Sequence, residues 1–126
     1  MKLLFVMLHI FLYPIACNSS KTDAVRTFIP GTYVRFSDQE MRKEYDTLKI
    51  EMLSDAGNNY RLTRSSSFQK RLDGQVFPWE FKKEEWTAIY DASKRVLQET
   101  KKRKVISFVP ERNILFAGTT KYKKIK

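Results

Sequence analysis

The chain has 126 residues, of which 24 are Lys or Arg and 14 are Asp or Glu, and its formal net charge is +10. This length is enough for one domain with a single hydrophobic core. Because the only histidine is His9 and the only cysteine is Cys17, the sequence after residue 17 excludes a Ser-His-Asp triad and a His/Cys zinc site.

The N-terminal segment predicts a secretory signal peptide over residues 1–16. Lys2 supplies a positive start, and the run from Leu3 to Ala16 is almost entirely apolar. The run is shorter than the about 20 apolar residues of a membrane-spanning helix. This combination is typical of a segment that is removed after export, so cleavage is expected after Ala16.

The junction Pro14-Ile15-Ala16-Cys17 resembles the bacterial lipobox, in which a small residue precedes a lipid-modified cysteine. The whole chain is also similar to small lipoproteins of Bacteroidota-type bacteria, a family without an established activity. The resemblance implies that Cys17 carries the lipid and that the protein is exported and anchored in the cell envelope. Asn18, in place of the Asp that favours inner-membrane retention, implies the outer membrane. Ordinary cleavage that leaves a free thiol at Cys17 is the alternative.

Behind this segment, residues 17–27 are predicted to form the lipidated N-terminus and a flexible tether, because they are mostly small and polar. Residues 28–126 are expected to form a single β-domain. Its strands are predicted from alternating or β-branched segments bounded by turn residues. They cover residues 31–36, 47–52, 60–71, 77–81, 86–90, 96–100, 105–109 and 114–122.

Three connections have distinct signals. Residues 37–43 are predicted to form a short helical turn, and Asp73-Gly74 is a strong signal for a hairpin. The strands over 77–81 and 86–90 carry their apolar residues at odd and at even positions respectively. A switch of the inward face is therefore expected near Glu84-Glu85, at a bulge or bend.

Short strands joined by short turns predict an all-β fold, a small antiparallel up-and-down barrel or sandwich of about seven to eight strands. Gly31-Thr32-Tyr33 at the start of the first strand, and the Lys- and Tyr-rich end of the last strand, are similar to small lipocalin-like domains. That resemblance implies that the first and last strands pair.

Positive charge is concentrated in the C-terminal third, where residues 91–126 hold 11 Lys or Arg and 3 Asp or Glu. The run Lys101, Lys102, Arg103 and Lys104 predicts a contact surface for an anionic partner. In an exported protein we expect an envelope protein or an anionic polymer rather than a nucleic acid. A merely solvated charged face is the alternative.

Four aromatic residues are candidates for the lining of a ligand cavity: Trp79, Phe81, Trp86 and Tyr90. A barrel of about eight strands can hold one small ligand or be filled by its own side chains, so packing in the core is the alternative. Glu84 and Glu85 are adjacent, and neighbours on a strand point to opposite faces. Acid–base catalysis by this pair of carboxylates is therefore not expected.

The sequence predicts a binding protein rather than an enzyme. The predicted function is that of a membrane-anchored envelope lipoprotein that binds or scaffolds an anionic partner through its basic C-terminal surface. The alternative is a lipocalin-like carrier of a small apolar ligand. No catalytic residue, metal ligand or cofactor is expected, and neither glycine-rich nucleotide motif occurs.

Overall fold

The computed structural model describes residues 23–54 and 57–126. Strands dominate it, with one short α-helix and one turn of 3-10 helix. The elements in chain order are α1 (Ala24–Phe28), β1 (Gly31–Gln39), β2 (Arg42–Met52), β3 (Asn59–Leu72), β4 (Gln75–Val76), β5 (Glu80–Asp91), β6 (Val96–Glu99), β7 (Val105–Val109), η2 (Pro110–Arg112), β8 (Ile114–Ala117) and β9 (Thr120–Lys124).

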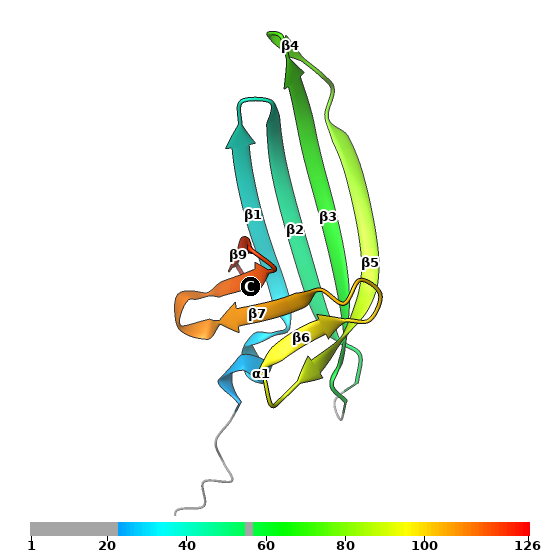
Figure 1. Cartoon of the computed structure of the whole chain (residues 1–126), viewed down its shortest axis with the longest axis vertical. Coiled ribbons are helices and arrows are strands. Elements are labelled where there is room, and N and C mark those ends of the chain that lie inside the picture. The colour runs from blue at the N-terminus through cyan, green and yellow to red at the C-terminus, as the bar shows by residue number, and fades with distance from the viewer. Residues whose placement is uncertain (1–22, 55–56) are drawn as a thin grey trace, which may run out of the picture.

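Eight of the strands form one closed antiparallel barrel (Figure 1). Its order around the ring is β1, β2, β3, β5, β6, β7, β8 and β9, so each strand pairs with the next along the chain. β9 closes the ring by pairing with β1 at Tyr33 and Val34. β4 is an additional strand beside the end of β3. The predicted up-and-down, lipocalin-like barrel is therefore confirmed, including the pairing of first and last strands.

The barrel has a long half and a short half. β1, β2, β3 and β5 have 9, 11, 14 and 12 residues, whereas β6 to β9 have only 4 or 5 each. Because each strand residue adds about 3.3 Å, the long strands project past the short ones (Figure 1). We call this projection, beyond the cross-strand row of Arg35, Asp46, Ser66 and Lys82, the distal sheet.

The hydrophobic core fills the part of the barrel that all eight strands enclose. Alternate residues of each strand face inward, as the period of two requires. The alternating apolar residues of the predicted strands are buried at Leu48, Ile50, Tyr60, Leu62, Ala88 and Tyr90, whereas Met52, on the same face of the strand over 47–52, is exposed. The same cluster contains Val25, Ile29, Tyr33, Leu97, Ile106, Phe108, Leu115 and Tyr122.

Helix α1 covers the end of the barrel that lies opposite the distal sheet (Figure 1). Asp23 caps the helix, because its carboxylate accepts hydrogen bonds from the backbone N–H groups of Val25 and Arg26. Val25 and Ile29 are buried in the core. The helix occupies part of the range predicted as a tether, since burial of these two side chains holds it on the barrel.

Gly31 is required where the two ends of the domain meet. Its φ is 150°, and a Cβ atom there would overlap the carbonyl oxygen of Lys126. That oxygen accepts a hydrogen bond of 3.2 Å from the N–H of Thr32, and the N–H of Ile125 donates to the Thr32 carbonyl at 2.9 Å. The glycine of the lipocalin-like tripeptide thus lets the C-terminus lie against β1.

The connections differ from the predictions in three places. Residues 37–43 form the β1–β2 hairpin rather than a helical turn, because β1 pairs with β2 along its whole length, up to Gln39 opposite Arg42. β5 pairs with β3 without a bulge, so no face switch occurs near Glu84-Glu85. The segment predicted as one strand over 114–122 is a hairpin that turns at Gly118, where φ is 63°. The turn at Asp73-Gly74 is confirmed, with positive φ at both residues.

Asp46 is the centre of a polar layer at the border between the barrel and the distal sheet. Its side chain is completely buried. Arg64 donates two hydrogen bonds to it, from Nε to Oδ1 at 3.0 Å and from Nη2 to Oδ2 at 2.9 Å. Ser66 donates to Oδ1, and Arg35 and the hydroxyl of Tyr122 each lie 3.4 Å from Oδ2.

Burial acts to raise the pKa of the Asp46 carboxyl, but the hydrogen bonds from Arg64 and Ser66 outweigh burial and lower this pKa below its usual value. A buried carboxylate is tolerated only when it is paired and hydrogen-bonded. The ionised Asp46 therefore links β2 to β1, β3 and β9 at the level where the short strands end.

We expect Asp46→Asn to lower the free energy of unfolding by about 3 kcal/mol, because it removes the shortest ion pair of the partly buried Arg64 and leaves only the longer pairs with Glu44 at 3.5 Å and Glu84 at 3.9 Å. Urea denaturation measures this loss. The matched control on the same strand is Glu51→Gln, which removes an exposed ion pair with Lys49 and should barely move the midpoint. Equal effects of the two substitutions would contradict the role given to Asp46.

The same pair of proteins gives a pH test. Because the pKa of Asp46 is lower in the folded than in the unfolded chain, its contribution to stability is present above the unfolded value of about 3.9. The contribution disappears as the pH falls through the folded value. Acidification should therefore destabilise the wild type more than Asp46→Asn.

Candidate functional site

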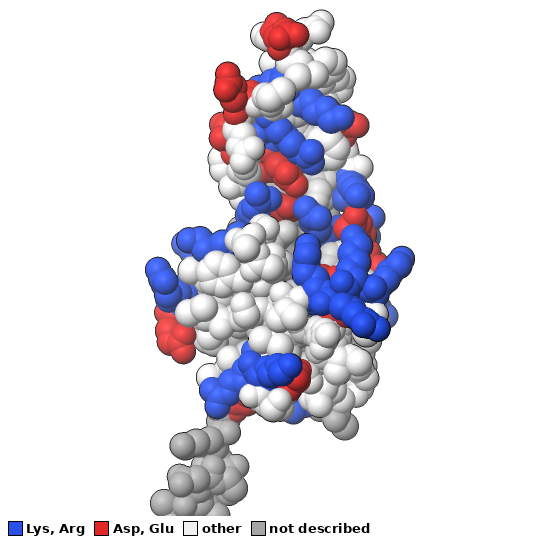
Figure 2. All heavy atoms as spheres, in the orientation of Figure 1, with Lys and Arg blue, Asp and Glu red and all other residues white. Residues whose placement is uncertain are grey.

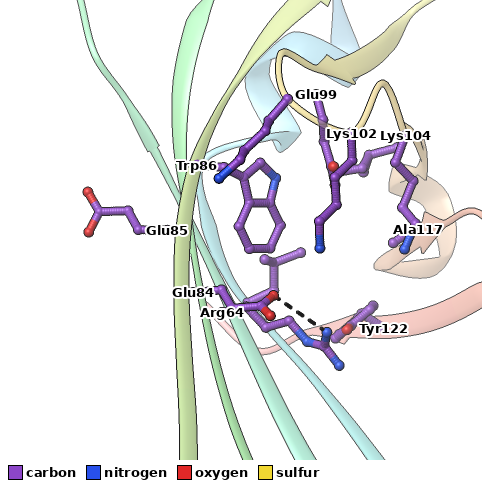
Figure 3. A pocket seen from close by; sticks show the side chains of 12 residues that line it. Arg64, Glu84, Glu85, Trp86, Glu99, Lys102, Lys104, Ala117 and Tyr122 are labelled. Atoms are coloured by element: carbon purple, nitrogen blue, oxygen red, sulfur yellow. Dashed lines mark ion pairs between the residues drawn. The ribbon is translucent and has the colours of Figure 1, made fainter.

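A cavity of about 320 Å³ opens at the mouth of the barrel, between β5 and the loop that joins β6 to β7 (Figure 3). Its inner wall is apolar and aromatic. Leu48 from β2, Ile106 from β7 and Ala117 from β8 lie there, together with the rings of Trp86 and Tyr122. The cavity is thus the unfilled upper end of the core, left open where the short strands stop.

Trp86 supplies the largest apolar surface in this wall, and its ring points into the cavity (Figure 3). Its Nε1 atom is buried and makes no hydrogen bond of normal geometry within the described part of the chain. Buried donors are nearly always paired. The indole N–H acts instead on the Glu99 carboxyl, where burial raises the pKa and the indole partly opposes this rise.

The outer rim of the cavity is cationic. Lys101, Lys102 and Lys104 of the β6–β7 loop line it, and Figure 2 shows Lys and Arg side chains gathered over this loop. The ion pairs formed within residues 23–54 and 57–126 involve none of these three lysines. Arg103 has a left-handed backbone, with φ of 52°, and lines a separate, more open hollow instead.

Glu99, at the end of β6, places a carboxyl group in the cavity wall. It is only 4% exposed. Burial raises the pKa of Glu99, while Lys104, Lys102 and the Trp86 indole act in the opposite direction. The ionised form of Glu99 is therefore held at a cost in free energy, which the nearby lysines only partly offset.

Glu84 and Glu85 point in opposite directions, as expected for neighbours on a strand (Figure 3). Glu84 points into the cavity and pairs with Lys82 at 2.8 Å and with Arg64 at 3.9 Å. Its hydrogen bond with Lys82 lowers the pKa of Glu84. Glu85 pairs with Arg61 at 3.3 Å on the outer surface. The two carboxylates therefore face opposite sides of β5, although both residues border the cavity.

The structure separates the four aromatic residues that were candidates for the cavity lining. Trp86 lines the cavity, whereas Tyr90 is buried in the core and donates a hydrogen bond of 2.5 Å to Asp23. Trp79 and Phe81 do not line the cavity, and they are 37% and 81% exposed. Because β5 is continuous, its odd positions face outward when Trp86, Ala88 and Tyr90 face inward.

Sequence reasoning did not identify Arg64, Glu99 or Tyr122 as residues of the site. They come from β3, β6 and β9, and only the register of the barrel brings them together. One local signal was present for Glu99. It lies two positions after the buried Leu97, so it occupies an inward position of the same strand.

The predicted cleavage position Ala16 and the predicted lipid-attachment residue Cys17 lie outside the described residues. Among the residues that are described, no group of three or more metal-binding side chains occurs. None of the described helices is long and apolar enough to cross a bilayer. Comparisons with protein-family models, with curated proteins and with solved structures gave no match for this chain.

We expect Glu99→Gln to raise the midpoint of unfolding at neutral pH, because it removes a buried negative charge. The raised pKa also fixes the sign of the pH dependence. The stabilising protonated form of Glu99 is lost as the pH rises through the folded value, so the benefit of Glu99→Gln should shrink on acidification. Thermal unfolding across a pH series measures this.

Glu84→Gln is the control for Glu99→Gln, because the pKa of Glu84 is lowered rather than raised. Removal of its charge should lower the midpoint of unfolding at neutral pH. If both substitutions raised the midpoint of unfolding, the removal of any negative charge from the cavity, and not the burial of Glu99, would explain the effect.

Proposed function

We propose that the protein is a binding module that takes a small amphipathic organic anion, such as a carboxylate or sulfonate with a short apolar body, at the mouth of its barrel. The observation that carries this proposal is the cavity itself, which joins an apolar, aromatic wall to a rim of three lysines. The proposal is one of binding and not of catalysis.

The size of the cavity supports a small ligand. Its volume of about 320 Å³ lies at the low end of the range of about 300–1,000 Å³ that is typical of small-molecule sites. The apolar body would contact Trp86, Ile106 and Ala117. The headgroup would lie at the rim, where it remains partly hydrated.

The charge of the rim favours an anion over a neutral ligand. Glu84 is already paired with Lys82 and Arg64, whereas Lys101, Lys102 and Lys104 have charge available for a ligand. The proposed site combines the two functions that the sequence predicts. The basic run supplies the contact with an anion, and the barrel supplies the apolar site of a lipocalin-like carrier.

Trp86 can report directly on binding, because the protein has two tryptophans and Trp79→Phe leaves Trp86 alone. We expect octanesulfonate to change the Trp86 emission saturably, and octanol and octyltrimethylammonium to bind more weakly. The matched control is Trp86→Phe, which keeps the surface residue Trp79 and should show no saturable change. Equal binding of all three compounds would contradict an anion site, and no binding would exclude the cavity as a ligand site.

Two neighbouring residues of the β6–β7 loop give a substitution and its matched control. Lys102→Gln should weaken octanesulfonate binding about fivefold, the equivalent of ~1 kcal/mol, since Lys102 lines the cavity. Arg103→Gln removes the neighbouring charge, which lines the other hollow, and should leave binding unchanged. Equal losses would indicate nonspecific attraction to a basic surface.

We also propose that Cys17 carries a lipid and anchors this module in the cell envelope. The support is the apolar run that ends at Ala16 and the lipobox-like junction. One acyl chain binds a membrane only marginally, and two or more anchor a protein stably. The anchor and the cavity are separate proposals, because either can hold without the other.

Intact mass of the mature protein tests the anchor. We expect a chain that begins at Cys17 and carries the added mass of diacylglycerol and of an acyl group. Cys17→Ala should release the protein from the membrane fraction, whereas Ser19→Ala should not. A mature mass without lipid would overturn this proposal.

A further inference from the structure

The upper part of β5 is a free sheet edge. β6 pairs with β5 only at residues 88–91, and the last hydrogen bond between them is donated by the N–H of Thr100 to the carbonyl of Thr87, at 3.1 Å. Residues 80–86 of β5 have β3 on one side and no strand on the other, within the described part of the chain.

The alternation of an antiparallel ladder identifies which backbone groups face this edge. Thr87 directs its carbonyl toward β6, and Tyr90 directs its N–H to the opposite side, where Asn58 accepts it at 2.7 Å. Successive residues alternate between the two neighbours. The N–H and C=O groups of Phe81, Lys83 and Glu85 therefore point to the open side, whereas those of Lys82 and Glu84 bond to β3.

A row of exposed apolar side chains ends at the same edge. Phe36, Tyr45, Ser67 and Phe81 are cross-strand neighbours on the outer face of β1, β2, β3 and β5. The rings of Phe36 and Tyr45 are 4.7 Å apart and those of Tyr45 and Trp79 are 5.8 Å apart. Phe81, at the edge, is the most exposed of these rings. An added strand would extend this row by one apolar side chain and cover Phe81.

The inner side of the edge is lined by cations. Lys102 and Lys104 lie across the cavity from Glu84 and Trp86 of β5 (Figure 3), and Lys101 also lines this cavity. Glu84 has its own counter-ion in Lys82 at 2.8 Å, and the three lysines Lys101, Lys102 and Lys104 outnumber the buried Glu99 in the cavity lining, so the net charge at this side of the edge is positive. An added strand with acidic residues at its inward positions would match that charge.

We propose that the free edge of β5 binds an extended acidic segment of a partner protein as an added strand, in line with β6. Its backbone pairs with Phe81, Lys83 and Glu85. Its outward apolar residues pack beside Phe81, and its inward acidic residues face Lys101 and Lys102. Strand addition of this kind takes its affinity from main-chain hydrogen bonds and its specificity from alternate side chains.

Charge disfavours two other occupants of the edge. A second copy of this chain carries the same formal charge of +10, so the two would repel at this surface. An anionic membrane would meet Glu40 and Asp73, the exposed carboxylates at the β1–β2 and β3–β4 turns of the distal sheet. An acidic peptide meets neither obstacle.

Amide hydrogen exchange measured by NMR, with and without a blocked peptide Asp-Val-Asp-Phe-Asp-Val-Asp, tests the proposal on the full mature chain. We expect protection of the Phe81, Lys83 and Glu85 amides to rise about tenfold or more at saturation. The Lys82 and Glu84 amides, already bonded to β3, should not change. Unchanged exchange at Phe81, Lys83 and Glu85, or protection that appears on the β1 edge instead, overturns it.

Matched peptides separate the backbone from the charge. The peptide Lys-Val-Lys-Phe-Lys-Val-Lys should not bind, and N-methylation of the residues that pair with β5 should abolish binding of the acidic peptide. If the N-methylated peptide protects the same amides, the contact is not strand addition. Exchange at rising protein concentration without peptide tests self-association, and protection under that condition overturns the assignment to a partner.

Lys83→Pro gives a second route. It removes an N–H that faces the open side and spares the ladder to β3, a position where edge strands tolerate proline. Peptide binding should be lost in Lys83→Pro and retained in Lys83→Gln, which keeps the N–H. If Lys83→Pro does not fold, the N-methylated peptide decides the question on the wild type. This readout is independent of the Trp86 emission, so the cavity and the edge fail or succeed separately.

Discussion

The buried carboxylate of Asp46 is the interaction on which the upper half of this molecule depends. It receives hydrogen bonds from β3 through Arg64 and Ser66, and it contacts Arg35 of β1 and Tyr122 of β9. Below this level, apolar side chains from all eight strands hold the sheet closed. Above it the short strands have ended, and no core is available to hold the long ones. At this level the hydrogen bonds and ion pairs of Asp46 hold the strands together in place of apolar packing, because their donors come from both the long and the short half of the barrel.

The unequal lengths of the strands explain why the candidate surfaces lie where they do. A barrel with eight equal strands would fill its mouth with side chains and pair all its backbone. Here the short strands stop early, and two different openings result. The interior is left open beside Trp86 and the β6–β7 loop, and the backbone of β5 is left without a neighbour. One opening suits a small anion and the other suits an extended chain, and the lysines of one loop border both.

The sequence was sufficient to predict an all-β barrel or sandwich, because most strands show local alternation and turn residues mark most of their ends. It did not show that β5 is one continuous strand or that residues 114–122 form a hairpin. The site was much harder to predict, because its residues share no local pattern. In the sequence Asp46 is one polar residue between two predicted strands, and its partners lie 11, 18, 20 and 76 positions away. The aromatic residues of β5 show that an odd or even position along the strand decides which side chains face inward. A bulge near Glu84 would have turned Phe81 inward, but the ladder with β3 is regular, so one unbroken register put an aromatic ring outside.

The attachment of α1 has a mechanical consequence. The helix is the first described element, and Asp23, at its start, bonds to Tyr90 at the lower end of β5, while Arg26 donates to the carbonyl of Gly57 at 3.2 Å. A pulling force applied to the chain ahead of Asp23 therefore reaches the barrel through these two contacts, the buried Val25 and Ile29, and the hydrogen bonds that Tyr33 and Lys124 donate to the last carbonyls of the helix. These contacts would yield before the strand ladders, which break only when many hydrogen bonds fail together. The helix would therefore detach and extend first under load, while the far end of the barrel keeps its shape.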